Sequence, residues 1–382
     1  MEWKEVTISD IANLKNGKKR PSELGVIPVF GGNGIMEYVN SFNSEDTIVI
    51  GRVGAYCGCV YFSKGKCWVS DNAIAAKAKA GNDNEYLYYL LSSLNLNHHH
   101  IGGAQPLMTQ DIIGRIEVVV PQKKDDQRRI ASILSSLDRK IELNNKINAG
   151  LEEMAQAIFK NWFVDFEPFK DGKFVDSELG MIPEGWKVVT LDDLTSKFGT
   201  GLNPRKNFVL GHGNNYYVTI KNMGDNRIYL NDRCDKVDDE ALAKINKRSK
   251  LQKGDLLFSG IGTIGRVAMV VEDPLNWNTS ESVFNMHPID SVSSEFIYLL
   301  LLSDIFQQYV RQNAQGGVQQ GIRMASLKAF QLAIPDDLKF FDNLVKPIIA
   351  KVKSNDREND HLSLLRDTLL PRLMSGKIEV LD

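Results

Sequence analysis

The chain repeats its own sequence, and this internal repeat limits its possible folds more than any other feature. The segment EWKEVTISDI at 2–11 aligns without a gap with GWKVVTLDDL at 185–194. A second segment, GGAQPLMTQDIIGRIEVVVPQ from residue 102, aligns with GGVQQGIRMASLKAFQLAIPD from residue 316. Such self-similarity indicates that one structural unit occurs twice. A chain of 382 residues is also too long for one small core, so we expect at least two domains.

A heptad pattern follows each of these globular segments. From Ile130 to Trp162, apolar residues and asparagines recur in alternating steps of four and three, which predicts a helix with a coiled-coil seam, about 50 Å long at 1.5 Å per residue. The pattern recurs near the C-terminus, where Pro347 replaces Ser136 and is expected to start or kink the helix. The predicted seam positions are Leu137, Ile141, Asn144, Asn148 and Leu151, aligned with Ile348, Val352, Asn355, Asn359 and Leu362.

Each predicted seam contains two asparagines. A buried asparagine costs stability but fixes helix register, because its amide needs a partner at the same level. The same pair in both repeats predicts that the two helices pack on each other. The alternative is that each helix packs only on its own globular neighbour. Replacing Asn144 and Asn355 together with leucine should keep the chain folded but relax the register.

These patterns divide the chain into four segments. We expect a globular domain at 1–122, a helical region with its linker at 123–182, a second globular domain at 183–336 and a second helical region at 337–382. Within the second segment, the polar stretch 165–182 contains Gly and Pro and is typical of a linker. The expected fold class is α/β, of the α+β kind, with two β-rich globular domains separated by two long helices.

A glycine motif in the second repeat raises the question of nucleotide binding. GDLLFSGIGTIGRVAMVV at 254–271 has the spacing G-x-G-x-x-G at Gly260, Gly262 and Gly265. A dinucleotide site needs a helix directly after the glycines. Here they precede the β-branched run RVAMVV, and the first repeat has TIVIGRVGAYCGCVYF in the corresponding place. We therefore predict a β-hairpin in each repeat rather than a nucleotide or S-adenosylmethionine site.

Sequence signatures of catalysis and metal binding are missing. No cysteine follows a proline and no two prolines are adjacent, which argues against both cytosine and adenine methyltransferases. No Gly-Lys pair precedes Ser or Thr, so there is no P-loop. The four cysteines form no C-x-x-C, and the triple histidine at 98–100 lacks an acid or cysteine to complete a metal site. We predict no catalytic residue and no metal ligand.

The composition is ordinary for a soluble protein, with 43% hydrophobic and 25% charged residues. The N-terminal MEWKEVTISD does not resemble a signal peptide. The longest apolar run, FIYLLLL at 296–302, is far too short to span a membrane. We expect a cytoplasmic protein that does not bind membranes.

Three segments closely resemble the specificity subunits of type I restriction-modification systems: MIPEGWKVVTLDDL, DQRRIASILSSLDRKIELNNKINAGLEEMAQAIFKNWF and LLRDTLLPRLMSGKI. The resemblance covers the whole chain. It implies that each globular domain is a target-recognition domain for one half of a split double-stranded DNA site. It also implies that the helices pack antiparallel, giving a pseudo-twofold repeat, and dock two methyltransferase subunits, through which restriction subunits join. S-adenosylmethionine and ATP would belong to these partners, so no cofactor is expected here.

The charge pattern shows where DNA contacts are expected. With 46 Lys and Arg against 48 Asp and Glu, nonspecific DNA affinity should be weak. The basic turns KNGKKRP at 15–21 and GLNPRKN at 201–207 suit phosphate contacts, or are merely solvated. Loop arginines, amides and hydroxyls suit base contacts, or have structural roles in turns. The DNA-binding candidates are Lys18, Lys19, Arg20, Arg52, Tyr56, Ser70, Asn72, Gln105, Asn203, Arg205, Lys206, Thr263, Arg266, Asn278, Ser280, Gln319, Gln320 and Arg323.

Two rival functions remain. A methyltransferase that uses the glycine loop would bind S-adenosylmethionine without partners. A protein-only scaffold would show no DNA sequence preference even in a complex. A third variant is that only the second domain recognises DNA. If the helices set the distance between half-sites, a heptad inserted into 137–151 should change the unread gap.

Overall fold

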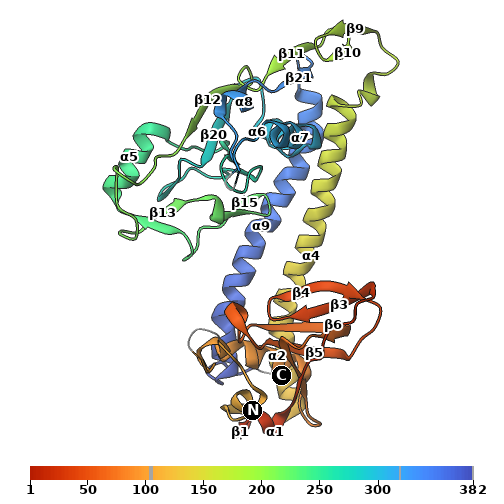
Figure 1. The fold of residues 1–382 in the computed structure, drawn as a ribbon, viewed down its shortest axis with the longest axis vertical. Helices are drawn as coiled ribbons and strands as arrows, with labels where there is room; N and C mark the ends of the chain where they lie inside the picture. Colours follow the sequence, from red (N-terminus) through yellow and green to blue (C-terminus); the bar gives the residue numbers. More distant parts are fainter. Residues whose placement is uncertain (103–105, 318–319, 381–382) are drawn as a thin grey trace. The chain divides into compact units, whose positions relative to one another are not determined.

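The computed structural model describes residues 1–102, 106–317 and 320–380. These residues form two compact units. Unit 1 comprises Met1–Asn144 with Arg357–Asp382, and unit 2 comprises Asn145–Asp356. The long helices α4 (Lys124–Phe163) and α9 (Lys339–Met374) each contribute one part to each unit (Figure 1). The long helices and the mixed α/β class are therefore as the sequence predicts, but the helices are integral parts of the globular units.

Unit 1 is built on a twisted sheet with the strand order β2-β7-β5-β6-β3-β4. All neighbours are antiparallel except β3 and β6, which run parallel. One face of the sheet contacts α2, and the core on this face also contains Ile130 and Leu134 of α4 and Leu373 of α9. The bounds are β1 Trp3–Thr7, α1 Ile8–Ile11, β2 Ala12–Asn16, β3 Leu24–Gly31, β4 Gly34–Val39, β5 Ser44–Gly51, η1 Gly54–Tyr56, β6 Val60–Val69, β7 Ala73–Ala78, α2 Asn84–Ser93, η2 Leu96–His98, α3 Gln110–Gly114 and β8 Glu117–Pro121.

Unit 2 contains the sheets β12-β20-β17-β18 and β16-β13-β19. Its main core contains residues of α6, α7 and both long helices, and α6 meets these helices through aromatic side chains. Phe163 packs on Phe296 and Phe341 at ring distances of 5.0 and 4.8 Å. The bounds are η3 Glu167–Phe169, β9 Phe174–Ser177, β10 Gly180–Pro183, β11 Lys187–Thr190, β12 Thr195–Thr200, β13 Asn215–Val218, η4 Ile220–Asn222, β14 Met223–Gly224, β15 Arg227–Ile228, β16 Asp235–Val237, α5 Asp239–Ser249, β17 Leu256–Ser259, β18 Val267–Met269, β19 Trp277–Thr279, β20 Val283–Pro288, α6 Ser294–Leu302, α7 Asp304–Asn313, α8 Met324–Lys328 and β21 Gln331–Ile334.

The sequence repeat corresponds to repeated structure. In unit 1, β1 pairs antiparallel with β8, and in unit 2, β11 pairs antiparallel with β21. The turn after each first strand closes in the same way, because Asp10 accepts hydrogen bonds from Thr7 and Asp193 accepts them from Thr190. These hydrogen bonds hold the pKa of both carboxyl groups below its ordinary value. The repeat is therefore present down to individual side-chain contacts.

The long helices pack antiparallel on each other inside each unit. In unit 1, Asn144 Nδ2 donates to Asn359 Oδ1 at 2.9 Å, and the Arg366 guanidinium donates to Asp138 at 2.8 Å. In unit 2, Phe159 packs on Phe341 at a ring distance of 6.1 Å. The predicted packing of helix on helix is confirmed.

Of the predicted seam side chains, all of the asparagines and one aliphatic residue are buried, whereas the other aliphatic residues are half-buried. The buried ones are Asn144, Asn148, Val352, Asn355 and Asn359, and the half-buried ones are Leu137, Ile141, Leu151, Ile348 and Leu362.

The structure excludes one of the two alternatives for Pro347, and it differs from the expectation for the linker. The helix α9 begins at Lys339, so Pro347 does not start it but lies within it. The predicted linker at 165–182 contains structure of its own, since β9 and β10 form an antiparallel hairpin. The polar composition of this segment did not predict the two strands, because a short exposed hairpin buries few apolar residues.

Candidate functional site

Polar loops from distant parts of unit 1 are joined by backbone hydrogen bonds. The amide of Lys18 donates to Val69 O at 3.0 Å, that of Arg52 to Asn72 O at 3.0 Å, and that of Gly54 to Pro106 O at 3.1 Å. The loops come together because β2, β5 and β7 are neighbours in one sheet, whose ends they extend. We call these loops loop cluster 1, made of the described residues 15–21, 51–59, 70–73, 101–102 and 106–107.

Unit 2 builds the corresponding loops by corresponding bonds. Gly260 N donates to Ser282 O at 2.9 Å and Gly262 N donates to Gln320 O at 2.8 Å. The serine turns also match, because Val283 N donates to Ser280 O at 3.2 Å, as Ala73 N donates to Ser70 O at 3.0 Å. We call these loops loop cluster 2, made of the described residues 201–207, 259–266, 280–283, 315–317 and 320–321. Sequence reasoning named the loops, and the structure brings them together.

A glycine holds each basic turn against the neighbouring loop. A Cβ atom on Gly17 would lie 1.9 Å from the Ser70 carbonyl oxygen, and one on Gly201 would lie 1.7 Å from that of Thr279. Neither approach is possible for any other residue, because 3.0 Å is already tighter than most real contacts. The basic turns are therefore fixed in place by close backbone packing.

In unit 2, Tyr217 and Glu281 add polar contacts to the basic turn. Tyr217 Oη donates to Leu202 O at 2.9 Å and to Glu281 Oε2 at 3.2 Å, while Asn203 Nδ2 donates to Glu281 Oε1 at 2.7 Å. Burial, together with the negative charge of Glu281, raises the pKa of Tyr217. The phenol therefore keeps its proton and its role as a donor.

Many of the predicted DNA-contact side chains are exposed on these loops. Arg20 is partly neutralised by an ion pair of 3.0 Å with Glu37. Exposure leaves the others accessible to a ligand approaching from solvent. The exposed candidates are Lys18, Lys19, Arg20, Tyr56 and Asn72 in loop cluster 1, and Arg205, Lys206, Thr263, Gln320 and Arg323 in or next to loop cluster 2.

Two other candidates, one buried and one half-buried, have side chains bonded within the fold. Asn278 is fully buried, and its amide donates to Ser249 O at 2.9 Å and to Asn246 at 2.7 Å. The Arg266 guanidinium donates to the carbonyls of Ile220, at 2.9 Å, and of Met223. These two side chains are engaged in hydrogen bonds within unit 2.

The remaining candidates are buried serines, a half-buried arginine and two glutamines. Ser70 and Ser280 are 2% and 4% exposed. Arg52 is half-buried and donates to Asp71 O at 3.5 Å. Gln105 and Gln319 lie outside the described residues.

The glycine motif closes a hairpin, as predicted. The strands β17 and β18 pair antiparallel, and β5 and β6 do so in the first repeat. Each glycine also has a packing or backbone reason. A Cβ on Gly260 would lie 2.1 Å from the Phe284 ring, and Gly262 and Gly265 adopt positive φ angles of 83° and 94°. No helix follows to receive a phosphate, so a dinucleotide fold is not formed at 254–271.

Two kinds of feature are absent from the described parts of the chain. No cluster of three or more His, Cys, Asp or Glu side chains could hold a metal ion. No helix is long and apolar enough to cross a membrane.

Sequence reasoning missed a basic side chain beside loop cluster 1 and an acid in unit 2. Lys77 on β7 lies opposite Asn13 on β2, and Asp255 before β17 is completely buried. The strand alternation AIAAKA at 73–78 carries the signal for Lys77, because it places this lysine on the face opposite to Ile74 and Ala76. No comparable local signal predicts the contacts of Asp255.

Comparison with known proteins agrees with this architecture. The family model for the type I restriction modification DNA specificity domain matches residues 1–153 and 183–354. The chain is 26% identical over 363 residues to the type I restriction enzyme HindI specificity subunit of Haemophilus influenzae, covering 77% of each chain. It is 28% identical over 313 residues to the MjaIX specificity subunit of Methanocaldococcus jannaschii, covering 79% of this chain and 71% of the relative.

A solved structure shows a similar fold. The type I restriction-modification S subunit from M. genitalium superposes with a TM-score of 0.61 at 17% identity, covering 98% of this chain and 96% of the other. The family model matches both repeats and most of the chain. The chain therefore belongs to the family of type I restriction-modification specificity subunits.

Proposed function

We propose that this chain is a non-catalytic subunit that binds a bipartite, asymmetric DNA site, with one half bound by each unit. The observation that supports this most directly is the equivalence of the two loop clusters. Each assembles a glycine hairpin and a serine turn through corresponding hydrogen bonds, and in each a glycine packs the basic turn against the neighbouring loop. The exposed side chains differ between the clusters, so the two half-sites should differ in sequence.

The exposed groups suit the two tasks of a DNA-binding protein. Arg205 and Lys206 are exposed cations of the kind that contacts phosphates, which position a protein on DNA. Gln320 and Arg323 carry donors of the kind that distinguishes base edges in the major groove. In unit 1, Lys18 and Lys19 are the candidates for phosphate contacts, and Tyr56 and Asn72 are the candidates for base contacts.

The proposal includes docking of methyltransferase subunits, with restriction subunits joining through them. Exposed apolar side chains on the long helices support the binding of a protein partner there, because a partner would shield them from water. In unit 1, Leu143 of α4 is 53% exposed and Leu364 of α9 is 68% exposed. In unit 2, Ile147 and Met154 lie two turns apart on one face of α4 and are 39% and 53% exposed. S-adenosylmethionine and ATP would then be bound by the partners.

A methylome tests the proposal. The chain is expressed with the adenine methyltransferase encoded beside it, and N6-methyladenine is mapped by long-read sequencing. We expect one split motif with a fixed gap. Arg323→Ala should relax one position of one half-site, by about 1–3 kcal/mol of discrimination, while Arg311→Ala, an exposed arginine on α7, should leave both halves unchanged.

Other outcomes would contradict the proposal. An assembled complex that methylates nothing would favour a protein-only scaffold. Binding of S-adenosylmethionine by the purified chain, abolished by Gly262→Ala, would favour a methyltransferase. If substitutions in unit 2 relaxed the sequence specificity of methylation and substitutions in loop cluster 1 did not, unit 2 alone would recognise DNA.

A further inference from the structure

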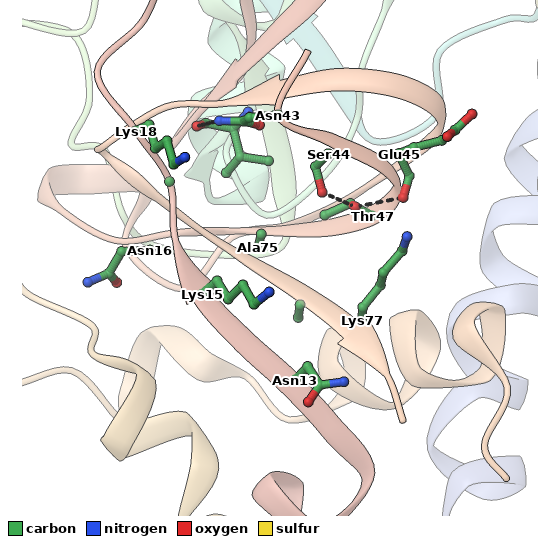
Figure 2. Close-up of a pocket in the computed structure, with 13 residues that line it drawn as sticks. Asn13, Lys15, Asn16, Lys18, Asn43, Ser44, Glu45, Thr47, Ala75 and Lys77 are labelled. Atoms are coloured by element: carbon green, nitrogen blue, oxygen red, sulfur yellow. Dashed lines mark hydrogen bonds between the residues drawn. The ribbon is translucent and has the colours of Figure 1, made fainter. Parts of the chain in front are cut away.

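A basic groove of about 540 Å³ lies on the sheet of unit 1, beside loop cluster 1. Figure 2 shows Lys15, Lys18 and Lys77 around it, with Thr47 and Glu45 on the β5 side. All three lysines are exposed. Among the described residues none of them forms an ion pair, so the groove carries three unpaired cations and the exposed carboxylate of Glu45.

Strand register places two of these lysines on the same face. Lys15 of β2 lies opposite Ala75 of β7, and Lys77 of β7 lies opposite Asn13 of β2. Lys15 and Lys77 are therefore diagonal cross-strand neighbours, with their Cα atoms roughly 7–8 Å apart. Ala76, which lies between Ala75 and Lys77 in sequence, is 1% exposed, and its side chain belongs to the core. Two like charges on the same face of neighbouring strands repel each other, and an anion bound between them would offset this repulsion.

On the corresponding face of the second repeat, basic side chains are partnered by a carboxylate of the same unit. Ile48 pairs with Ala76 as Leu256 pairs with Met286, and this register aligns Thr47 with Asp255.

The flanking strand positions align in the same way. Lys77 lies opposite Asn13, and the aligned pair in unit 2 is His287 opposite Lys197. Asp255 Oδ2 lies 3.2 Å from Lys197 Nζ, and Asp255 Oδ1 lies 2.8 Å from His287 Nδ1. A buried carboxylate thus partners the basic side chains of unit 2.

Unit 1 has no carboxylate at the corresponding position. Thr47 is buried, and its hydroxyl donates to Glu45 O at 3.0 Å rather than meeting a lysine. Lys77 is therefore left without the carboxylate that contacts the aligned His287 in unit 2. The two units differ in electrostatics at a site where their backbones correspond.

We propose that this groove binds backbone phosphates of the DNA next to the half-site contacted by unit 1, and that unit 2 has no equivalent contact. The inference rests on the proposed DNA-binding function. Lys18 supports it by continuity, because it lines the groove and also belongs to the basic turn of loop cluster 1. The phosphate contacts of unit 1 would extend from that turn along β2 and β7.

The test is the salt dependence of DNA binding by the assembled complex with its methyltransferase subunits. The variant Lys15→Gln with Lys77→Gln is compared with Lys64→Gln with Lys173→Gln, which removes two exposed lysines outside the groove. Each phosphate contact contributes about 0.9 to the slope of log K against log salt. We expect the groove variant to reduce the magnitude of the slope by about 2, and the control to leave it unchanged.

A second pair of variants tests the electrostatic argument. Thr47→Asp introduces the acid that unit 2 carries, and Thr47→Val keeps the shape without the charge. We expect weaker DNA binding for Thr47→Asp only. An equal loss of DNA affinity in both Thr47 variants would contradict phosphate binding by the groove. A salt slope unchanged by the lysine substitutions, in a complex that binds its site, would contradict it as well. A native complex without site-specific binding would instead overturn the proposed function.

Discussion

Asn355 Nδ2 donates a hydrogen bond of 2.8 Å to Asn148 Oδ1 in the interface between α9 and α4 of unit 2. Unit 1 has the equivalent pair, in which Asn144 donates to Asn359. Asn144 and Asn355, whose joint replacement the sequence suggested, thus belong to different pairs. The informative double variants are Asn148→Leu with Asn355→Leu, and Asn144→Leu with Asn359→Leu.

These asparagine pairs lead to the first prediction. Asn355→Leu alone should lower the free energy of unfolding by about 1–3 kcal/mol, because it removes the donor to a buried oxygen of Asn148. The double variant with Asn148→Leu should recover most of this loss, since no unpaired amide remains. Chemical denaturation of all four proteins in the cycle measures the coupling. A double variant that loses the sum of the single losses would contradict a specific pair.

The glycines beneath the basic turns give a second prediction. Gly17→Ala should lower the free energy of unfolding by about 2 kcal/mol or more, because its Cβ would collide with the Ser70 carbonyl. It should also disturb recognition of one half-site in the methylome. Gly150→Ala is the control, because its Cβ meets nothing within 4 Å on α4, and it should raise stability by about 0.5–1 kcal/mol. If both variants behaved alike, the close packing of Gly17 would have no energetic consequence.

A half-buried carboxyl group in unit 2, that of Glu152, predicts a pH effect. Burial raises the pKa of Glu152, whose Oε1 accepts from Asn226 Nδ2 at 3.3 Å. The folded state then holds this proton more tightly than the unfolded chain. The stability that this gives is present below about pH 4.5, the ordinary pKa of a glutamate. It is lost as the pH rises through the pKa of the folded state. Glu152→Gln keeps an acceptor for Asn226 and removes the charge. We expect its melting temperature to exceed that of the native chain at pH 7, with a difference that shrinks toward pH 4.

Helix length gives a fourth prediction. One heptad inserted into α4 within 137–151, and one inserted opposite it in α9, keeps the seam and adds about 10 Å to each helix. If the helices set the spacing of the half-sites, the methylated motif should change its unread gap while both half-sites keep their sequences. Long-read methylation mapping measures this directly. An unchanged gap with full methylation would show that the helices do not set it.

Local sequence patterns determined the elements of this protein. The repeat, the heptads and the glycine hairpins could all be predicted, because periodicity and turn chemistry act over a few neighbouring residues. The asparagines of the seam were identified in the same way, since their spacing alone places them on the apolar face. The family resemblance likewise rests on contiguous segments of sequence.

Tertiary structure alone decided which polar residues are available and which are not. Nothing local distinguishes Asn278, which is buried beneath its loop, from the exposed Asn72. Nor does sequence alone reveal that Lys77 lies beside Lys15, or that Asp255 partners His287. These relations join residues far apart in the chain, and strand register sets them, because a shift by one residue would turn every side chain to the other face.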